Sequence, residues 1–168
     1  MRYWIGLGSN LGDRLSTLRG GARAVENLGA VIARSRVFAA SPVGGPPQPP
    51  FLNAVIVIES DLDPATMLRE CQKIEHDFGR EREAERVRWG PRTLDLDMLL
   101  MGARGEVRLS SDDLEVPHPR LHERAFALAP LVDIDTKLVH PSAGRALTAL
   151  LHAMQNQGHA VAPTGDLL

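Results

Sequence analysis

Apolar and polar residues follow two different periods along this chain. Short apolar runs at residues 3–7, 31–38 and 51–58 have the length and the composition of β-strands. The segments after the first and third runs carry an apolar residue at every third or fourth position, which is the spacing of one helix face. These stripes consist of Leu15, Leu18, Ala22 and Val25 in the first segment and of Met67, Cys71, Ile74 and Phe78 in the second. With a strand after residue 94, the pattern predicts the order β-α-β-β-α-β for residues 3–101.

Capping residues support both predicted helices. Gly29 follows the first apolar stripe and Gly79 follows the second, and glycine commonly ends a helix. Asp63 and Pro64 precede the second stripe, where they combine an N-cap residue with a proline at the first helical position. The second helix is therefore expected to begin at Pro64.

Patterns are weaker in the C-terminal part of the chain. Turn residues between 102 and 113 favour a hairpin, and apolar residues near Leu128 predict a short helix. A further amphipathic stripe predicts a last helix over residues 145–154. At 168 residues the chain is long enough to form one domain with its own core. We expect that domain over residues 1–160 and a tail over residues 161–168.

Composition and charge narrow the classes of function. The chain has 19 basic and 21 acidic residues, a formal net charge of −2 and 4% aromatic residues, which argues against a nucleic-acid-binding surface. No apolar run reaches 18 residues, and the first residues resemble neither a signal peptide nor a transit peptide, so we expect no membrane contact and a cytoplasmic protein. The single cysteine, Cys71, excludes an internal disulfide and a cysteine-rich metal site.

Two acids, Asp95 and Asp97, stand two residues apart shortly after a Gly-Pro turn. In a strand they share one face, while Leu94, Leu96 and Met98 lie on the other. Two neighbouring carboxylates repel each other, which raises the pKa of at least one of them, and a divalent cation relieves this repulsion. Mg²⁺ usually sits on one or two carboxylates plus substrate phosphates. The pair therefore predicts a magnesium site for a nucleotide phosphate.

An arginine-rich segment precedes this acid pair. Its arginines are Arg80, Arg82, Arg86, Arg88 and Arg92. They alternate with glutamates, accompany Trp89 and follow no apolar period, which predicts a charged, mobile loop. Guanidinium groups match phosphate oxygens, and such a loop can cover a metal-bound polyphosphate. A solvated loop with ordinary ion pairs is the alternative, and the adjacent acid pair argues against it.

Several other residues are candidates for binding. Phe51 and Asn53 share one face of a predicted strand, and a ring beside an amide suits a flat heterocycle that stacks and forms hydrogen bonds at its edge. A core phenylalanine beside a turn-facing asparagine is the alternative. His118 is held between two prolines, although a lone histidine is more often structural. Gln72 and Glu75 flank the second helical stripe and face either solvent or a ligand.

Two other motifs in the sequence match known nucleotide-binding patterns only in part. Gly6 and Gly8 begin a dinucleotide-binding pattern, but its third glycine would fall at position 11, which is Leu11. A nucleotidyltransferase pairs a Gly-Ser turn with two acids close in sequence, whereas Ser9 and Asp95 are far apart. Residues 41–50 contain five prolines and two glycines, which exclude a helix or central strand and predict a functional loop.

Four segments, in this order, resemble the 6-hydroxymethyl-7,8-dihydropterin pyrophosphokinase family of the folate pathway. They are GLGSNLGD at 6–13, FLNA at 51–54, RWGPRTLDLD at 88–97 and VPHPRLHERAF at 116–126. The resemblance, over about residues 3–150, implies transfer of the terminal diphosphate of ATP to the hydroxymethyl group of a reduced pterin, with release of AMP. It also implies a single-domain α/β (α+β) fold, a ferredoxin-like sandwich whose mainly antiparallel sheet has helices packed on one face.

The resemblance further implies roles for individual residues. Asp95 and Asp97 match ligands of two Mg²⁺ ions, and Arg82 and Arg92 match catalytic arginines that bind the phosphates of the co-substrate ATP. The implied nucleotide contacts are Gln72, Glu75, Arg82, Trp89, Arg92, Met98, His118 and Arg124. The implied pterin contacts are Ser41, Pro42, Val43, Phe51, Asn53, Trp89 and Phe126. The expected partners are these small molecules, with neighbouring folate-pathway enzymes as a further expectation.

Two of the departures from the family pattern concern candidate site residues. The segment between Gly79 and Trp89 is longer than in well-known members, so the choice among Arg80, Arg82 and Arg86 stays open. Phe51 stands where many relatives carry tyrosine, which keeps stacking and removes a hydroxyl. A function of another class also stays open: a non-catalytic domain that binds a pterin or nucleotide and regulates a partner. An RNA-binding sheet is disfavoured by the low aromatic content.

Overall fold

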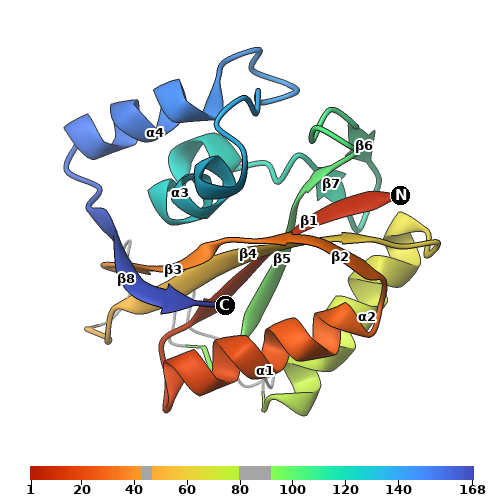
Figure 1. Cartoon of the computed structure of the whole chain (residues 1–168). Helices are drawn as coiled ribbons and strands as arrows, with labels where there is room; N and C mark the ends of the chain where they lie inside the picture. The colour runs from red at the N-terminus through yellow and green to blue at the C-terminus, as the bar shows by residue number, and fades with distance from the viewer. Residues whose placement is uncertain (43–46, 80–91) are drawn as a thin grey trace.

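The computed structural model describes residues 1–42, 47–79 and 92–168. Within these residues a six-stranded sheet forms the middle layer (Figure 1). Its strands are β1 (Arg2–Ser9), β2 (Ala30–Arg34), β3 (Arg36–Ala40), β4 (Phe51–Glu59), β5 (Asp95–Met101) and β8 (Val161–Leu167). The strand order is β5-β1-β4-β3-β8, with β2 also paired to β4, and each of these pairings is antiparallel. The α+β class is confirmed, and the predicted β-α-β-β-α-β order holds except that two strands, β2 and β3, stand where one was predicted.

The strand predicted over residues 31–38 is divided at Ser35. The N–H of Ser35 donates to the Val55 carbonyl at 2.9 Å, and its Oγ accepts from the Val55 N–H at 2.8 Å. A side-chain oxygen thus replaces a backbone partner at this point. The consequence is two short strands, β2 and β3, that both pair with β4.

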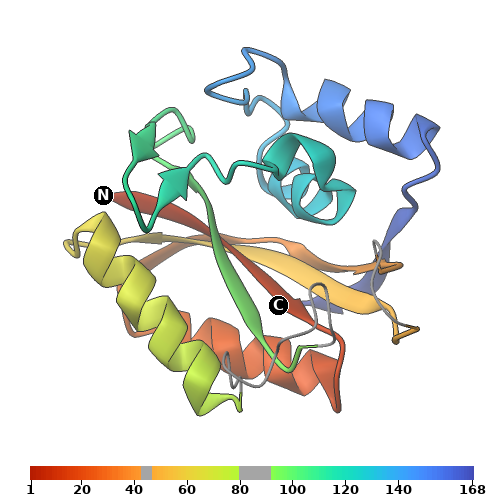
Figure 2. The ribbon, with the colours of Figure 1, turned by 180° about the vertical axis from the view of Figure 1, so that it is seen from behind.

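Helices cover both faces of the sheet (Figures 1 and 2). On one face lie α1 (Arg14–Glu26) and α2 (Pro64–Asp77), and on the other lie α3 (Ala125–Ile134) and α4 (Leu147–Asn156). The expectation of helices on one face is therefore wrong for the C-terminal pair. The physical reason is that α3 is apolar around most of its circumference and that β4 is buried at every residue from 53 to 58, so both need cover on the second face.

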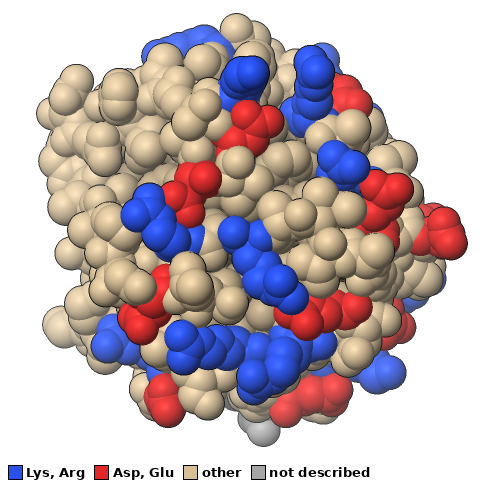
Figure 3. Space-filling model, viewed as in Figure 1, with Lys and Arg blue, Asp and Glu red and all other residues tan. Residues whose placement is uncertain are grey.

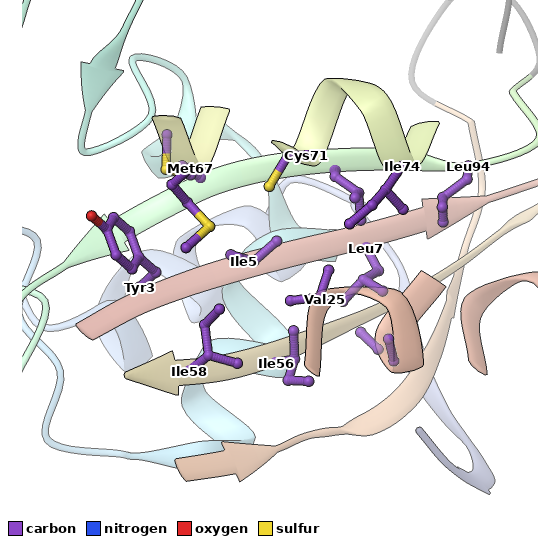
Figure 4. Close-up of a cluster of buried hydrophobic side chains, with 14 of the residues drawn as sticks. Tyr3, Ile5, Leu7, Val25, Ile56, Ile58, Met67, Cys71, Ile74 and Leu94 are labelled. Carbon is purple, nitrogen blue, oxygen red and sulfur yellow. The ribbon is translucent and has the colours of Figure 1, made fainter. Parts of the chain in front are cut away.

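The core between the sheet and the first helix pair is shown in Figure 4. Alternate residues of β1 and β4 point into it, and the predicted apolar stripes of α1 and α2 meet them. The labelled members are Tyr3, Ile5, Leu7, Val25, Ile56, Ile58, Met67, Cys71, Ile74 and Leu94. The predicted N-cap is confirmed as well, because Asp63 Oδ1 accepts a hydrogen bond from the Thr66 N–H at 3.0 Å.

Residues 161–167 form the edge strand β8, so the prediction of a tail at 161–168 is wrong. This strand pairs with β3, and Arg19 of α1 donates two hydrogen bonds to the Leu167 carbonyl, at 3.0 and 3.1 Å. Its sequence contains Pro163 and Gly165, which weaken the strand pattern but are tolerated at a sheet edge. The alternation of apolar and polar residues that marks other strands is therefore missing from this one.

Shorter elements connect the two halves of the fold. A two-stranded pair, β6 (Leu109–Ser110) and β7 (Glu115–Val116), lies near the hairpin expected from the turn residues, and a short 3₁₀ helix, η1 (Leu121–Glu123), leads into α3. Among the helices that the structure describes, none combines the length and the apolar character needed to span a bilayer. On the face in Figure 3, basic and acidic side chains are interspersed, in agreement with the nearly balanced composition.

Candidate active site

A cavity opens between one face of the sheet and the beginning of α3. Residues of β1, β4 and β5 form its floor, and the segment from Arg120 to Ala127 forms a wall. The lining residues are Gly6, Leu7, Gly8, Ala40, Ser41, Pro42, Gln48, Phe51, Asn53, Ala54, Val55, Arg92, Asp95, Asp97, Leu99, Arg120, Glu123, Arg124, Phe126 and Ala127. Segments far apart in the sequence thus contribute to one site.

The acid pair lies on the floor of this cavity. Asp95 and Asp97 both line it, whereas Leu96 and Met98 are buried in the core against the first helix pair. The predicted division of the strand into an acidic and an apolar face is confirmed. Burial, followed by the nearby Asp95 carboxylate, raises the pKa of Asp97 from its ordinary 3.8 to about 6. The pair therefore carries the unfavourable electrostatic energy that a bound cation would relieve.

Each acid is paired with an arginine. Arg92 Nη1 donates to Asp95 Oδ2 at 2.7 Å, and Arg124 Nη1 donates to Asp97 Oδ2 at 2.9 Å. The Arg124 guanidinium also lies near the Phe126 ring, with its Cζ 5.7 Å from the ring centroid. The two neighbouring carboxylates on the floor are therefore each bound by one guanidinium group. Guanidinium groups can bind phosphate and carboxylates can bind a cation, so this cluster offers both kinds of ligand.

The donor set fits Mg²⁺ that arrives with a nucleotide. Within the described residues, no group of three or more His, Cys, Asp or Glu side chains could enclose a metal ion. Two carboxylates are nevertheless the number that Mg²⁺ commonly takes from a protein when phosphates and water supply its remaining ligands. Asp95 and Asp97 would hold the ion, and no protein cage is needed.

Two aromatic side chains also line this cavity. Phe51 and Phe126 line it together with the backbone region of Ser41 and Pro42. Asn53 lines the same cavity, is buried, and its Nδ2 has no hydrogen-bond partner among the described residues. A buried amide donor left open in a cavity is a place for a ligand acceptor, because an unpaired polar group costs about 1–3 kcal/mol.

Gly8 lies where these groups meet. A Cβ at this position would be 3.4 Å from Asn53 Oδ1, 3.8 Å from the Asp95 Cβ and 3.9 Å from Phe51 Cδ1. Gly8 lines the cavity and leaves room for a ligand beside Asn53 and Asp95. Gly6, two residues earlier on the same face of β1, is covered instead by Leu99, whose Cδ1 would lie 2.9 Å from a Cβ at this position. The sequence presented these glycines as a partial dinucleotide pattern and within the 6–13 segment of the family resemblance, and the two-residue period of a strand was the further signal that they share a face.

Four predicted nucleotide contacts lie outside this cavity. Gln72 and Glu75 belong to α2, on the opposite face of the sheet, and Met98 is buried in the core there. The buried Glu75 instead accepts a hydrogen bond from the Leu96 N–H at 2.7 Å, which supports β5 between the two acids. His118 lies beyond β5 and its N–H donates to the Leu99 carbonyl at 3.0 Å.

His118 is held as a neutral ring. Its Nδ1 accepts from the Arg120 N–H at 3.1 Å. Burial, followed by the positive charge of Arg124, lowers the pKa of His118 from 6.5 to about 4. The other predicted residues Arg82, Trp89 and Val43, together with the alternatives Arg80 and Arg86, lie outside the described residues.

An acid pair with two arginines and two aromatic rings line one cavity on an antiparallel α+β fold, which is the combination that an enzyme transferring phosphate to a flat substrate needs. The sequence profile of the family described as 7,8-dihydro-6-hydroxymethylpterin-pyrophosphokinase (HPPK) matches residues 4–136. The chain belongs to this family. Members transfer the pyrophosphoryl group of ATP to hydroxymethyldihydropterin in folate synthesis, so a purely sensing domain is not favoured.

Individual relatives agree with this assignment. The 2-amino-4-hydroxy-6-hydroxymethyldihydropteridine pyrophosphokinase of Bacillus subtilis is 43% identical over 133 residues, which are 78% of this chain and 76% of that protein. The enzyme of the same name from Pseudomonas aeruginosa is 39% identical over 159 residues, 94% of each chain. A crystal structure of Plasmodium falciparum HPPK-DHPS has the same fold, with a TM-score of 0.69 and 16% identity; the match covers 95% of this chain and 46% of that longer one.

Proposed function

We propose that this cavity is where the chain transfers the diphosphate of ATP to 6-hydroxymethyl-7,8-dihydropterin. The acid pair Asp95 and Asp97 would hold two Mg²⁺ ions on the ATP phosphates, and the pterin would lie between the rings of Phe51 and Phe126. The observation that carries the proposal is that the acid pair, the two aromatic rings and Asn53 line one cavity. Both substrates can therefore meet without a large movement of the sheet.

Arg92 and Arg124 would act on the phosphates. Each guanidinium is bound to one of the two acids, at 2.7 and 2.9 Å, and could exchange that carboxylate for a phosphate oxygen once the acids hold cations. Mg²⁺ bound here would neutralise the oxygens on which charge accumulates during transfer. Arg82, which is expected on sequence grounds, would add a further positive charge as AMP leaves. No general base is assigned, because this type of transfer depends mainly on positioning and charge neutralisation.

The pterin would be recognised by stacking and by its polar edge. Phe51 and Phe126 supply flat apolar surfaces, and the open Nδ2 of Asn53 supplies a donor for a ring nitrogen or a carbonyl oxygen. The backbone around Ser41 and Pro42 lines the same cavity, where it could bind the remaining edge atoms. Val43 and Trp89 would complete this set according to the sequence resemblance.

The nucleoside part of ATP would lie along the outer edge of β5. Glu75 and His118 contact that strand at Leu96 and Leu99, and Gln72 lies one helical turn from Glu75. These contacts support a role for Glu75 and His118 in holding the strand beside the nucleotide, and the sequence resemblance adds Gln72 and Met98 to the nucleotide contacts. The neutral ring of His118 could then accept or donate a hydrogen bond without adding charge.

A neighbouring folate enzyme is the proposed protein partner. The folate synthesis bifunctional protein of Arabidopsis thaliana is 41% identical over 131 residues, and this match covers 26% of that protein. Fusion of this kind places two activities side by side, which supports a contact between this chain and an enzyme that uses its product. Sedimentation of a mixture of the two enzymes would test the contact.

Counting bound cations tests the proposed site. Mn²⁺, a magnetic substitute for Mg²⁺, would be titrated into the protein with a non-hydrolysable ATP analogue and the pterin, and free Mn²⁺ would be measured by electron paramagnetic resonance. We expect two ions per chain in the parent and fewer in Asp97→Asn. The matched control Asp61→Asn, at an exposed position, should still bind two. Two ions in Asp97→Asn would contradict the assignment of that ligand.

A further inference from the structure

Asn10 joins three segments of the chain beneath the cavity. It follows β1 directly, is only 1% exposed, and contacts residues 48–49 on one side and Arg92 on the other. We infer that Asn10 is a positioning residue, which sets the place of the Arg92 guanidinium and so the rate of transfer. This inference rests on the proposed function, in which Arg92 binds the phosphates of ATP.

Two hydrogen bonds connect Asn10 with the backbone of Arg92. The Arg92 N–H donates to Asn10 Oδ1 at 2.7 Å, and the Asn10 N–H donates to the Arg92 carbonyl at 3.1 Å. The two peptide groups that flank the Arg92 Cα are therefore both hydrogen-bonded to Asn10. With its backbone held in this way, Arg92 directs Nη1 onto Asp95 Oδ2 at 2.7 Å.

The amide nitrogen of Asn10 holds the other segment. Its Nδ2 donates to Gln48 Oε1 at 2.8 Å and to the Pro49 carbonyl at 3.2 Å. Gln48 lines the cavity, and Pro49 stands two residues before Phe51, the first residue of β4. One side chain thus holds two parts of the site. It binds the segment that precedes Phe51, the ring proposed to stack on the pterin, and it binds the backbone of Arg92, the arginine proposed to bind phosphate.

Only an asparagine-like side chain can satisfy this arrangement. It requires one acceptor for the Arg92 N–H and two donor hydrogens for Gln48 and Pro49, which are the groups that a primary amide offers. Because the position is buried, water cannot replace a lost partner without cost. Asn10 therefore positions Arg92, although it touches none of the reacting groups itself.

A double-mutant cycle on kcat tests the inference. We expect Asn10→Ala to lower kcat by about tenfold to a hundredfold in the parent, because a misplacement of about 1 Å can have an effect of that size. In the Arg92→Ala background the same change should lower kcat by a clearly smaller factor than in the parent, since the guanidinium it positions is already absent and only the contacts to Gln48 and Pro49 are lost. An equal loss in both backgrounds would overturn the inference and leave the proposed function intact.

Further variants separate the proposed function from the inference. If Arg92→Ala itself leaves kcat unchanged, the proposed role of Arg92 fails, and the role of Asn10 fails with it. Should Asn10→Ala not fold, Asn10→Ser takes its place in the cycle. Asn27→Ala, exposed at the end of α1, is the matched control and should leave kcat unchanged in both backgrounds.

Discussion

Replacing Asp97 by asparagine should make the metal-free protein more stable at high pH while removing its activity. The folded protein binds a proton on Asp97 with a pKa of about 6, against an ordinary value of 3.8, because the carboxyl is partly buried and lies beside Asp95. The folded state therefore holds more protons than the unfolded chain between about pH 4 and pH 6, and stability falls as the pH rises through this window. Above it, the full penalty for the ionised group is present.

The size of this penalty follows from the two pKa values. A rise from 3.8 to about 6 corresponds to at most about 3 kcal/mol. Because 32% of the Asp97 side chain is exposed, solvent screening reduces the figure to about 1–2 kcal/mol. Asparagine resembles the protonated carboxyl and can still accept from Arg124, so Asp97→Asn should gain this amount above pH 6 and almost nothing near pH 4.

Urea unfolding in the presence of EDTA provides the assay. At pH 8 the free energy of unfolding of Asp97→Asn should exceed that of the parent by about 1–2 kcal/mol, and at pH 4 the two should nearly coincide. Adding Mg²⁺ and ATP should then stabilise the parent more than the variant, because only the parent keeps both ligands. A variant that is less stable than the parent at pH 8, or a difference independent of pH, would refute the reasoning.

Three further predictions concern single side chains. Phe126→Ala should raise the Kd for the pterin about tenfold and leave the Kd for ATP unchanged by isothermal titration, because one stacking surface is lost; an unchanged pterin affinity would contradict the proposed stacking. Glu75→Ala should lower the free energy of unfolding by about 1–3 kcal/mol, since the Leu96 N–H loses its partner, whereas Glu75→Gln should retain most of it in urea titrations. Cys71, whose pKa burial raises to about 12, should react with Ellman's reagent at pH 8 only after unfolding; rapid reaction of the folded protein would contradict its burial.

The first half of the fold could be predicted because its elements carry regular periods. The stripes of α1 and α2 and the alternation around Asp95 and Asp97 each reflect one face against a core, and periodicity reports such a face directly. The second half lacked this signal. Helix α3 is apolar around most of its circumference, and β8 is an exposed edge strand with a proline and a glycine, so neither shows which surface it covers.

The candidate site was predictable where one strand brings its residues together. Asp95 and Asp97 needed only the two-residue period of a strand. Asn10 gave no such signal, because its partners are the side chain of Gln48, 38 residues away, and the backbone of Arg92, 82 residues away. The long-range pairing of β1 with its neighbours creates these contacts, and spacing along the chain does not report them.

The products of a single reaction test the central claim most directly. The protein would be mixed with ATP, Mg²⁺ and 6-hydroxymethyl-7,8-dihydropterin, and the nucleotides would be separated by chromatography. The account predicts AMP in amounts that depend on the pterin, with none from Asp97→Asn. Accumulation of ADP, or a folded protein that binds both substrates and forms neither nucleotide, would contradict it.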